Sequence, residues 1–233
     1  MKSRLKVSAR LHPALPAPSR AVPLVEFSGY LADDTVFDLI RTGTEAAMAR
    51  SDIAAPVFLC HSLGCFVGLD AASRLPGAQV IAINMPATPW HGFRRACVTA
   101  ARMTQIAGMR GFDEANHFRN SWIYFGRDRS DDIARQRLKQ IHQQTNCYTT
   151  PRRRDTALFL KSVLLEHRRK GPHAPRVLLV QGISDPIAPL GDAALLQKRL
   201  PGSVLATIRG AHVLPVTHPR EVVGEIASFL SGN

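Results

Sequence analysis

The chain has 233 residues, 45% of them hydrophobic, which is enough for one domain with a sizeable core and too few for two full domains. Its formal net charge of +12 comes with no recognised nucleic-acid-binding motif, and no apolar run approaches the roughly 18 residues of a membrane-spanning helix. The four cysteines form neither a disulfide framework nor a CxxC zinc pattern, so we expect a cytoplasmic protein without a metal, a cofactor, a nucleic-acid partner or a membrane anchor.

Residues 1–22 begin the chain with five basic side chains, no acidic ones and several prolines. This stretch lacks the continuous apolar core of a secretory signal, and its prolines oppose an amphipathic helix. We expect an irregular, basic N-terminal segment ahead of the folded part of the chain.

Short apolar runs bounded by turn residues predict buried parallel strands. These runs cover 23–27, 56–59, 79–84, 176–181 and 203–208. Helix-like patterns alternate with them, at 35–50, 63–75, 192–200 and 221–230. Strands that alternate with helices predict an α/β fold with a mainly parallel sheet flanked by helices. The core of this fold is expected over 23–89 and 171–233.

Residues 90–170 break the alternation, because they contain helix-like stretches and no clear strand. We expect a helical cap, inserted between two strands over one end of the sheet. Residues 90–173 carry 17 basic and seven acidic side chains, and this charge favours an acidic substrate or an acidic substrate carrier. The aromatic residues of the cap either line an apolar pocket or form its own core; they are Phe93, Phe112, Phe118, Trp122 and Phe125.

Ser62 follows one of the apolar runs and precedes a helix-like stretch. A nucleophile on such a sharp strand-to-helix turn has strained backbone dihedrals. The residues two before and two after it must therefore be small, as Cys60 and Gly64 are. The turn would present the hydroxyl at the top of the sheet, where the backbone N–H of Leu63 faces a developing oxyanion. The alternative is that Ser62 only caps the helix that follows it.

A serine nucleophile needs a base, and that base needs an acid to orient it. Asp185 and His212 each follow an apolar run in the last third of the chain. In a parallel sheet, both loops leave the same carboxyl edge as the loop that carries Ser62. We expect Asp185 to orient His212, and His212 to act as the base. The alternatives are that Asp185 caps its own turn and that His212 is an ordinary loop histidine.

Three other polar residues compete for these roles. Asp192 stands where the next helix would begin and is expected to cap it. His218 precedes Pro219 and the last helix, so helix entry explains it better than catalysis. His61, beside the serine, is expected to point elsewhere and is not chosen as the base.

These motifs resemble the α/β-hydrolase superfamily, in particular its capped small esterases and C–C bond hydrolases. The likeness rests on 60–64, 182–186 and 210–212 and covers about 23–233, with the cap similar in position only. It implies Ser62 as nucleophile, His212 as general base and acid, and Asp185 as the residue that orients His212. An acyl-enzyme on Ser62 would then be hydrolysed by water.

The front of the chain departs from that family pattern. Family members have further strands there, and a loop that supplies a second oxyanion donor to complement Leu63. Residues 1–22 are too short and proline-rich for those strands, which indicates an N-terminally shortened fold or a natural start further upstream. Either Ser28 or Gly29, after the first predicted strand, substitutes as the donor, or catalysis is weakened.

Two functions are consistent with this sequence. The first is hydrolysis of a small-molecule carboxylic ester or thioester, acidic or carrier-bound substrates included, through an acyl-enzyme on Ser62. The second is a catalytically weak or silent protein of the same fold that binds a ligand or a partner. The motifs favour the first, because three residue types with complementary chemistry follow three predicted strands.

Overall fold

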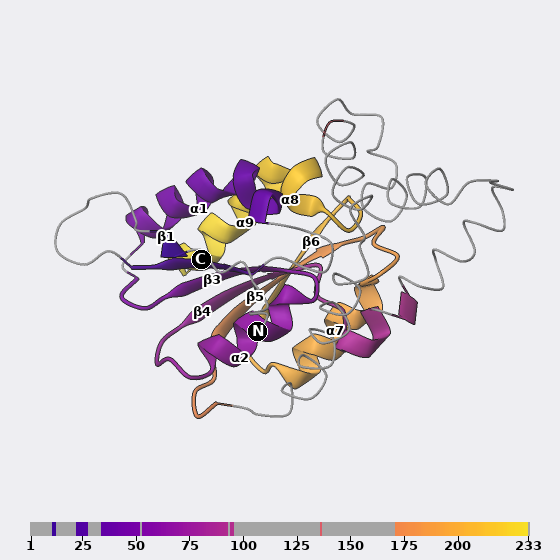
Figure 1. The fold of residues 1–233 in the computed structure, drawn as a ribbon, viewed down its shortest axis with the longest axis horizontal. Helices are drawn as coiled ribbons and strands as arrows, with labels where there is room; N and C mark the ends of the chain where they lie inside the picture. The colour runs from indigo at the N-terminus through magenta and orange to yellow at the C-terminus, as the bar shows by residue number, and fades with distance from the viewer. Residues whose placement is uncertain are drawn as a thin grey trace, which may run out of the picture.

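A six-stranded sheet forms the centre of the structure, a computed structural model that describes residues 11–12, 22–27, 34–51, 53–92, 94–95, 136 and 171–232. Its strands lie side by side in chain order (Figure 1). They are β1 (Leu11–His12), β2 (Leu24–Phe27), β3 (Val57–His61), β4 (Gln79–Ile83), β5 (Arg176–Gly182) and β6 (Val204–Ile208). From β2 to β6 every neighbouring pair is parallel, so the predicted α/β fold with a parallel sheet is confirmed.

Among the described strands, only β1 was not predicted. It pairs antiparallel with β2 at the edge of the sheet, with Leu11 opposite Val25 and His12 opposite Leu24. Two residues are too few to show the alternation by which a strand is recognised in a sequence, and prolines follow them directly. The pairing covers part of the edge that β2 would otherwise expose.

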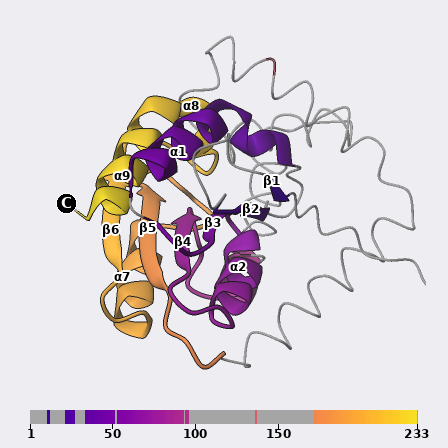
Figure 2. The same cartoon turned by 90° about the vertical axis from the view of Figure 1, so that its left-hand side faces the viewer.

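Helices cover both faces of the sheet, as Figures 1 and 2 show. On one face lie η1 (Asp34–Phe37), α1 (Asp38–Arg50), α8 (Leu214–Thr217) and α9 (Pro219–Ser231). The other face is covered by α2 (Gly64–Ala72) and α7 (Leu190–Arg199). Because helices lie on both sides, all five residues of β3 and six of the seven in β5 are buried.

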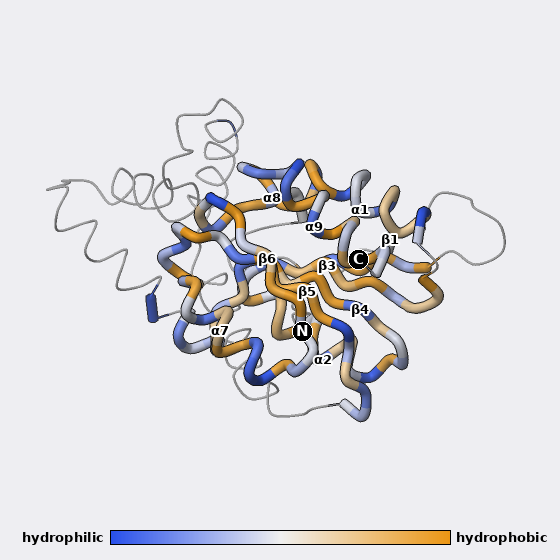
Figure 3. The backbone as a smooth tube through the Cα atoms, turned by 180° about the vertical axis from the view of Figure 1, so that it is seen from behind, coloured by the Kyte–Doolittle hydropathy of each residue, from blue (hydrophilic) through white to orange (hydrophobic). Residues whose placement is uncertain are grey.

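Two hydrophobic clusters fill the space between the layers, and the strands appear as the hydrophobic centre in Figure 3. Alternate residues of β3 divide between them: Leu59 joins the cluster under α1 and α9, whereas Phe58 and Cys60 join the cluster under α2. The helix α2 packs so closely on β3 that a Cβ at Gly68 would overlap the sulfur of Cys60. This packing holds the carboxyl end of β3 in a fixed position.

The predicted cap over 90–170 and its five aromatic side chains lie outside the described residues, apart from 90–92, 94–95 and 136. The described part of the chain therefore consists mainly of the layered core. None of its helices has the length and apolar content that crossing a bilayer requires.

Candidate active site

Ser62 stands at the carboxyl end of β3, on the turn that leads into α2. Its φ of 54° lies in the left-handed region, which a serine adopts only where the surrounding structure holds it. Its N–H donates to the carbonyl of Ile83 (2.9 Å), which anchors the turn to β4. Cys60 and Gly64, the small residues predicted on either side, are both buried. The N-cap of α2 is Leu63 without a side-chain cap, so the Ser62 hydroxyl does not cap the helix.

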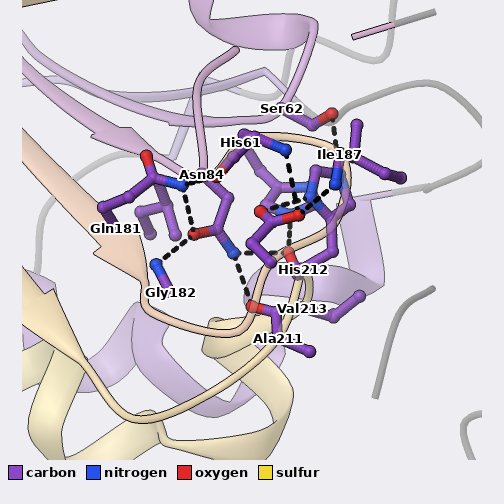
Figure 4. Close-up of polar contacts among 12 residues, drawn as sticks. His61, Ser62, Asn84, Gln181, Gly182, Ile187, Ala211, His212 and Val213 are labelled. Carbon is purple, nitrogen blue, oxygen red and sulfur yellow. Dashed lines mark hydrogen bonds and ion pairs between the residues drawn. The ribbon is translucent and has the colours of Figure 1, made fainter. Parts of the chain in front are cut away.

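His212 lies between Ser62 and Asp185, and the three side chains form one hydrogen-bonded chain. The Nε2 atom of His212 is 2.9 Å from Ser62 Oγ, and its Nδ1 atom is 2.7 Å from Asp185 Oδ2. Figure 4 shows Ser62 and His212 facing each other across this contact. With the proton on Nδ1, the neutral ring donates to the carboxylate and accepts from the serine hydroxyl. All three residues are buried: Ser62 is 5% exposed, Asp185 3% and His212 2%.

The two carboxylate oxygens of Asp185 have different partners. Oδ1 accepts the backbone N–H groups of Ile187 (2.8 Å) and Ala188 (3.0 Å), whereas Oδ2 faces His212. Asp185 therefore caps its own turn, the alternative role expected from the sequence, and contacts His212 at the same time. The two backbone bonds fix the rotation of the carboxylate, so that Oδ2 points at the imidazole.

Leu63 and Gly29 are the predicted oxyanion donors. Leu63 is the N-cap residue of α2, directly after Ser62, and the N–H groups of Cys65 and Phe66 that follow it donate to the carbonyls of Ser62 (3.2 Å) and Leu63 (3.3 Å). Gly29, like its alternative Ser28, lies outside the described residues. The strand before them ends close to the site, because Phe27 of β2 pairs with Cys60 of β3.

His61 is not in contact with the serine hydroxyl but with the backbone behind the base. Its Nε2 donates to the carbonyl oxygen of His212 (2.7 Å), and the centroids of the two imidazole rings lie 5.0 Å apart. Burial, together with the charge that His212 can carry, lowers the pKa of His61 to about 3. Its Nδ1 is buried without a hydrogen-bond partner in the described part of the chain, which matches a neutral ring. His61 therefore points away from the serine hydroxyl, as expected from the sequence.

The buried His61 makes the stability of the fold depend on pH. Its pKa is about 3 in the folded protein and about 6.5 in an unfolded chain, so its stabilising effect is complete above pH 6.5 and is lost as the pH falls toward 3. Between pH 7 and pH 4.5 we expect wild type to lose about 2–3 kcal/mol more of its free energy of unfolding than His61→Gln. Urea unfolding at both pH values measures this difference.

The exposed His173 provides the matched control for that measurement. The variant His173→Gln makes the same change at an exposed position and should follow the wild type closely at both pH values. Equal losses in wild type and His61→Gln would show that His61 is not held neutral.

Asn84 is a site residue that the sequence interpretation missed. It follows β4 and is 0% exposed, and its Nδ2 donates to the carbonyl oxygens of Ala211 (2.9 Å) and His212 (2.7 Å). Its Oδ1 accepts the N–H of Gly182 (2.7 Å). One signal was available: Asn84 is a polar residue at the end of a buried apolar strand, at the same sheet edge as the predicted triad.

Asp192 and His218 do not take part in the hydrogen-bonded chain. The prediction that Asp192 caps α7 is wrong: the N-cap is Pro189, and the Asp192 carboxylate instead accepts from the backbone N–H of Ala87 (2.7 Å) and from Arg95 (2.5 Å). The charged guanidinium of Arg95 forms a stronger hydrogen bond with the carboxylate than a backbone N–H at the helix end would. His218 is the N-cap residue of α9, in agreement with its predicted place at a helix entry.

Cys60 and Cys65 flank the turn as free, fully buried thiols, and burial raises the pKa of both. Their place in the cluster under α2 shows that they act there as small core residues. Among the described residues, no group of three or more histidine, cysteine or acidic side chains is arranged to hold a metal ion.

The geometry can be compared with known proteins. A model described as the alpha/beta hydrolase family matches residues 7–225. No protein with a curated description matches the sequence. The fold is similar to a hydrolase from Oleispira antarctica (TM-score 0.60, 12% identity, 90% of both chains covered). It is also similar to a thermophilic esterase from Thermogutta terrifontis (0.60, 13%, 97% of this chain and 98% of the other). A third similar structure is the enol-lactonase from Burkholderia xenovorans (0.51, 18%, 82% and 73%).

Proposed function

Because the chain belongs to the alpha/beta hydrolase family, we propose that it is a serine hydrolase that cleaves a carboxylic ester or thioester through an acyl-enzyme on Ser62. The observation that carries this proposal is the position of His212, 2.9 Å from the Ser62 hydroxyl and 2.7 Å from the Asp185 carboxylate. A nucleophile, a base and an orienting acid in this order can activate a hydroxyl at neutral pH.

In the first half of the proposed reaction, the Ser62 oxygen attacks the acyl carbon while Nε2 of His212 takes the hydroxyl proton. Asp185 stays ionised and stabilises the imidazolium that forms. His212 then gives the proton to the leaving alcohol or thiol as its bond to the acyl carbon breaks. In the second half, water transfers a proton to His212 and attacks the acyl-enzyme, and the carboxylic acid leaves as Ser62 regains its proton.

The negative oxygen of each tetrahedral intermediate needs hydrogen-bond donors. We propose the backbone N–H of Leu63 as the first donor and that of Gly29 as the second. The direct pairing of β2 with β3 supports the second assignment, because the chain leaves Phe27 beside the strand that ends at the nucleophile. One such donor contributes about a hundredfold or more to kcat.

The charge of the chain supports an extension of the proposal to acidic acyl donors. Residues 90–173 carry 17 basic and seven acidic side chains, whereas 24–89 and 174–233 together carry eight basic and 11 acidic side chains. A positive potential near a site raises the association rate of negatively charged substrates. The proposed substrates therefore include coenzyme A thioesters and acyl chains on an acidic carrier, beside neutral esters and lactones.

Labelling with a fluorophosphonate tests the proposal directly. The probe forms a phosphorus–oxygen bond with an activated serine and releases fluoride, so wild type should take up one label, on the peptide that contains Ser62. Ser62→Ala should take up none, because the nucleophilic oxygen is missing. Intact-mass and peptide mass spectrometry measure both results.

Ser231→Ala is the matched control, since Ser231 is exposed near the end of α9 and should not affect labelling. A competition arm tests the substrate class: an acyl-coenzyme A thioester should slow labelling more than an uncharged thioester of the same acyl chain. Folded wild-type protein that takes up no label would contradict the proposed function and favour the second candidate, a silent binding protein of this fold.

A further inference from the structure

We propose that Asn84 is a positioning residue that fixes the loop carrying His212 against the loop carrying Asp185, and thereby sets the alignment of the base with Ser62. This inference deepens the proposed function and rests on it. Nothing in the triad itself requires Asn84, because its side chain contacts none of the three reacting groups.

The first argument is the place of Asn84 in the sheet. His61 of β3 pairs with Ile83 of β4, so Ser62 and Asn84 are the next residues on two neighbouring parallel strands. Both have a left-handed φ, 54° for the serine and 50° for the asparagine. Their N–H groups each donate to the adjacent strand, to Ile83 (2.9 Å) and to Val180 (2.8 Å). Asparagine tolerates this backbone conformation better than most residues, so the position suits an amide side chain.

The second argument is that both hydrogens and the oxygen of the amide bond to the two loops, while the same oxygen also accepts from Nε2 of Gln181 in β5 (3.5 Å). Both hydrogens of Nδ2 are donated to the base loop, to the carbonyls of Ala211 and His212. Oδ1 accepts the N–H of Gly182, where the chain leaves β5 toward Asp185. Figure 4 shows the Asn84 amide between these groups. With the oxygen and nitrogen exchanged, like atoms would face each other at every contact, so the orientation of the amide is fixed.

The third argument is that Asn84 reaches the catalytic residue itself. Two backbone bonds also join the loops, from Ile183 N–H to Ile208 (2.9 Å) and from Ser184 N–H to Gly210 (3.0 Å), but both act before Ala211. The carbonyl of His212 accepts two side-chain donors, Nδ2 of Asn84 (2.7 Å) and Nε2 of His61 (2.7 Å). Its two lone pairs are then both occupied, and the backbone that carries the imidazole is held at that residue.

Replacing the amide by a carboxylate isolates this role. Asn84→Asp keeps the shape, tolerates the left-handed φ and retains an acceptor for Gly182, but places an oxygen against the two carbonyls of the base loop. A displacement of a base by a fraction of an ångström to an ångström lowers rates by up to about a hundredfold. We therefore expect a 10- to 100-fold lower kcat with KM changed by less than about threefold, and an equal fall in the rate of fluorophosphonate labelling.

Two further variants separate positioning from stability. Asn84→Gly removes the amide and accepts the same φ, so it should lower kcat to a similar extent even where Asn84→Asp folds poorly. Gln79→Glu makes the same amide-to-carboxylate change at the opposite end of β4 and should leave kcat within about threefold of wild type. All rates are measured at least 15 °C below the thermal midpoint of each variant, determined by circular dichroism.

The outcomes distinguish this inference from the function on which it rests. Wild type that is not labelled at Ser62 contradicts the proposed function. Labelled wild type, together with folded Asn84 variants that react at the wild-type rate, overturns the positioning role alone. A raised KM with unchanged kcat also overturns it, because Asn84 would then act in substrate binding. A selective fall in kcat and in labelling rate supports it.

Discussion

Replacing His212 with alanine is expected to lower kcat by about a millionfold, the scale seen when a serine hydrolase loses its base. The reason lies in the 2.9 Å contact between its Nε2 and the Ser62 hydroxyl, since no other described side chain bonds to that oxygen. Without the imidazole, the hydroxyl has no acceptor for its proton and the leaving group has no donor. Turnover of a chromogenic ester such as p-nitrophenyl acetate, measured under saturating conditions, gives the comparison.

His218→Ala is the matched control, because His218 lies six residues away in the sequence and serves the entry into α9. It should keep kcat within about threefold of wild type, since its ring contacts Thr217 and not the serine. Turnover of His212→Ala within about tenfold of wild type would exclude the triad, and one of the other histidines would then have to supply the base.

The second large effect is expected for Asp185→Asn, about ten-thousandfold in kcat. Oδ1 of Asp185 accepts two backbone N–H groups, from Ile187 and Ala188. An asparagine would keep its oxygen there, so its NH₂ group would face Nδ1 of His212. The imidazole would then carry its proton on Nε2, and this tautomer cannot accept a proton from Ser62. The fold should remain intact, because the backbone bonds persist.

Asp192→Asn provides the matched control for this change. Asp192 is equally buried and also accepts a backbone N–H, from Ala87, but its charged partner is Arg95 and not a histidine. Its replacement should lower the thermal midpoint, because the ion pair between the buried carboxylate and the half-buried Arg95 is lost, while kcat changes by less than about tenfold. If Asp185→Asn behaves in the same way, the carboxylate is structural and does not orient the base.

The layered fold could be predicted from the sequence because a strand buried on both faces needs a run of apolar residues, which is visible locally. A strand such as 79–83 is apolar at four of its five positions, and the strands and helices alternate in the order that parallel pairing needs. The steric demand of the turn at Ser62 is also local, since it fixes the size of Cys60 and Gly64. Asp185 and His212 were chosen because parallel strands bring their following loops to one edge, and the structure brings both side chains together with Ser62.

The supporting contacts could not be predicted in the same way. Asn84 and His61 act through a backbone carbonyl of His212, more than 120 residues away, and every residue offers such a carbonyl. No residue type marks that acceptor in the sequence. Asp192 was misinterpreted for a related reason: a helix start explained it locally, whereas its partners Ala87 and Arg95 lie 105 and 97 residues away in the sequence.

The pairing of β4 with β5 has a consequence for how such a chain can change over evolution. Ile83 and Arg176 are far apart in the sequence, yet their strands are adjacent and in register, and Ser62, Asp185 and His212 all lie outside the interval between them. The entropy of closing a loop grows only with the logarithm of its length, so each doubling costs about 0.6 kcal/mol. Beyond Arg95, after the contacts of Asn84, Ala87 and Arg95, insertions, deletions and substitutions can therefore accumulate in that interval at little cost to the sheet. The proposed triad of Ser62, Asp185 and His212 would not be interrupted by such changes.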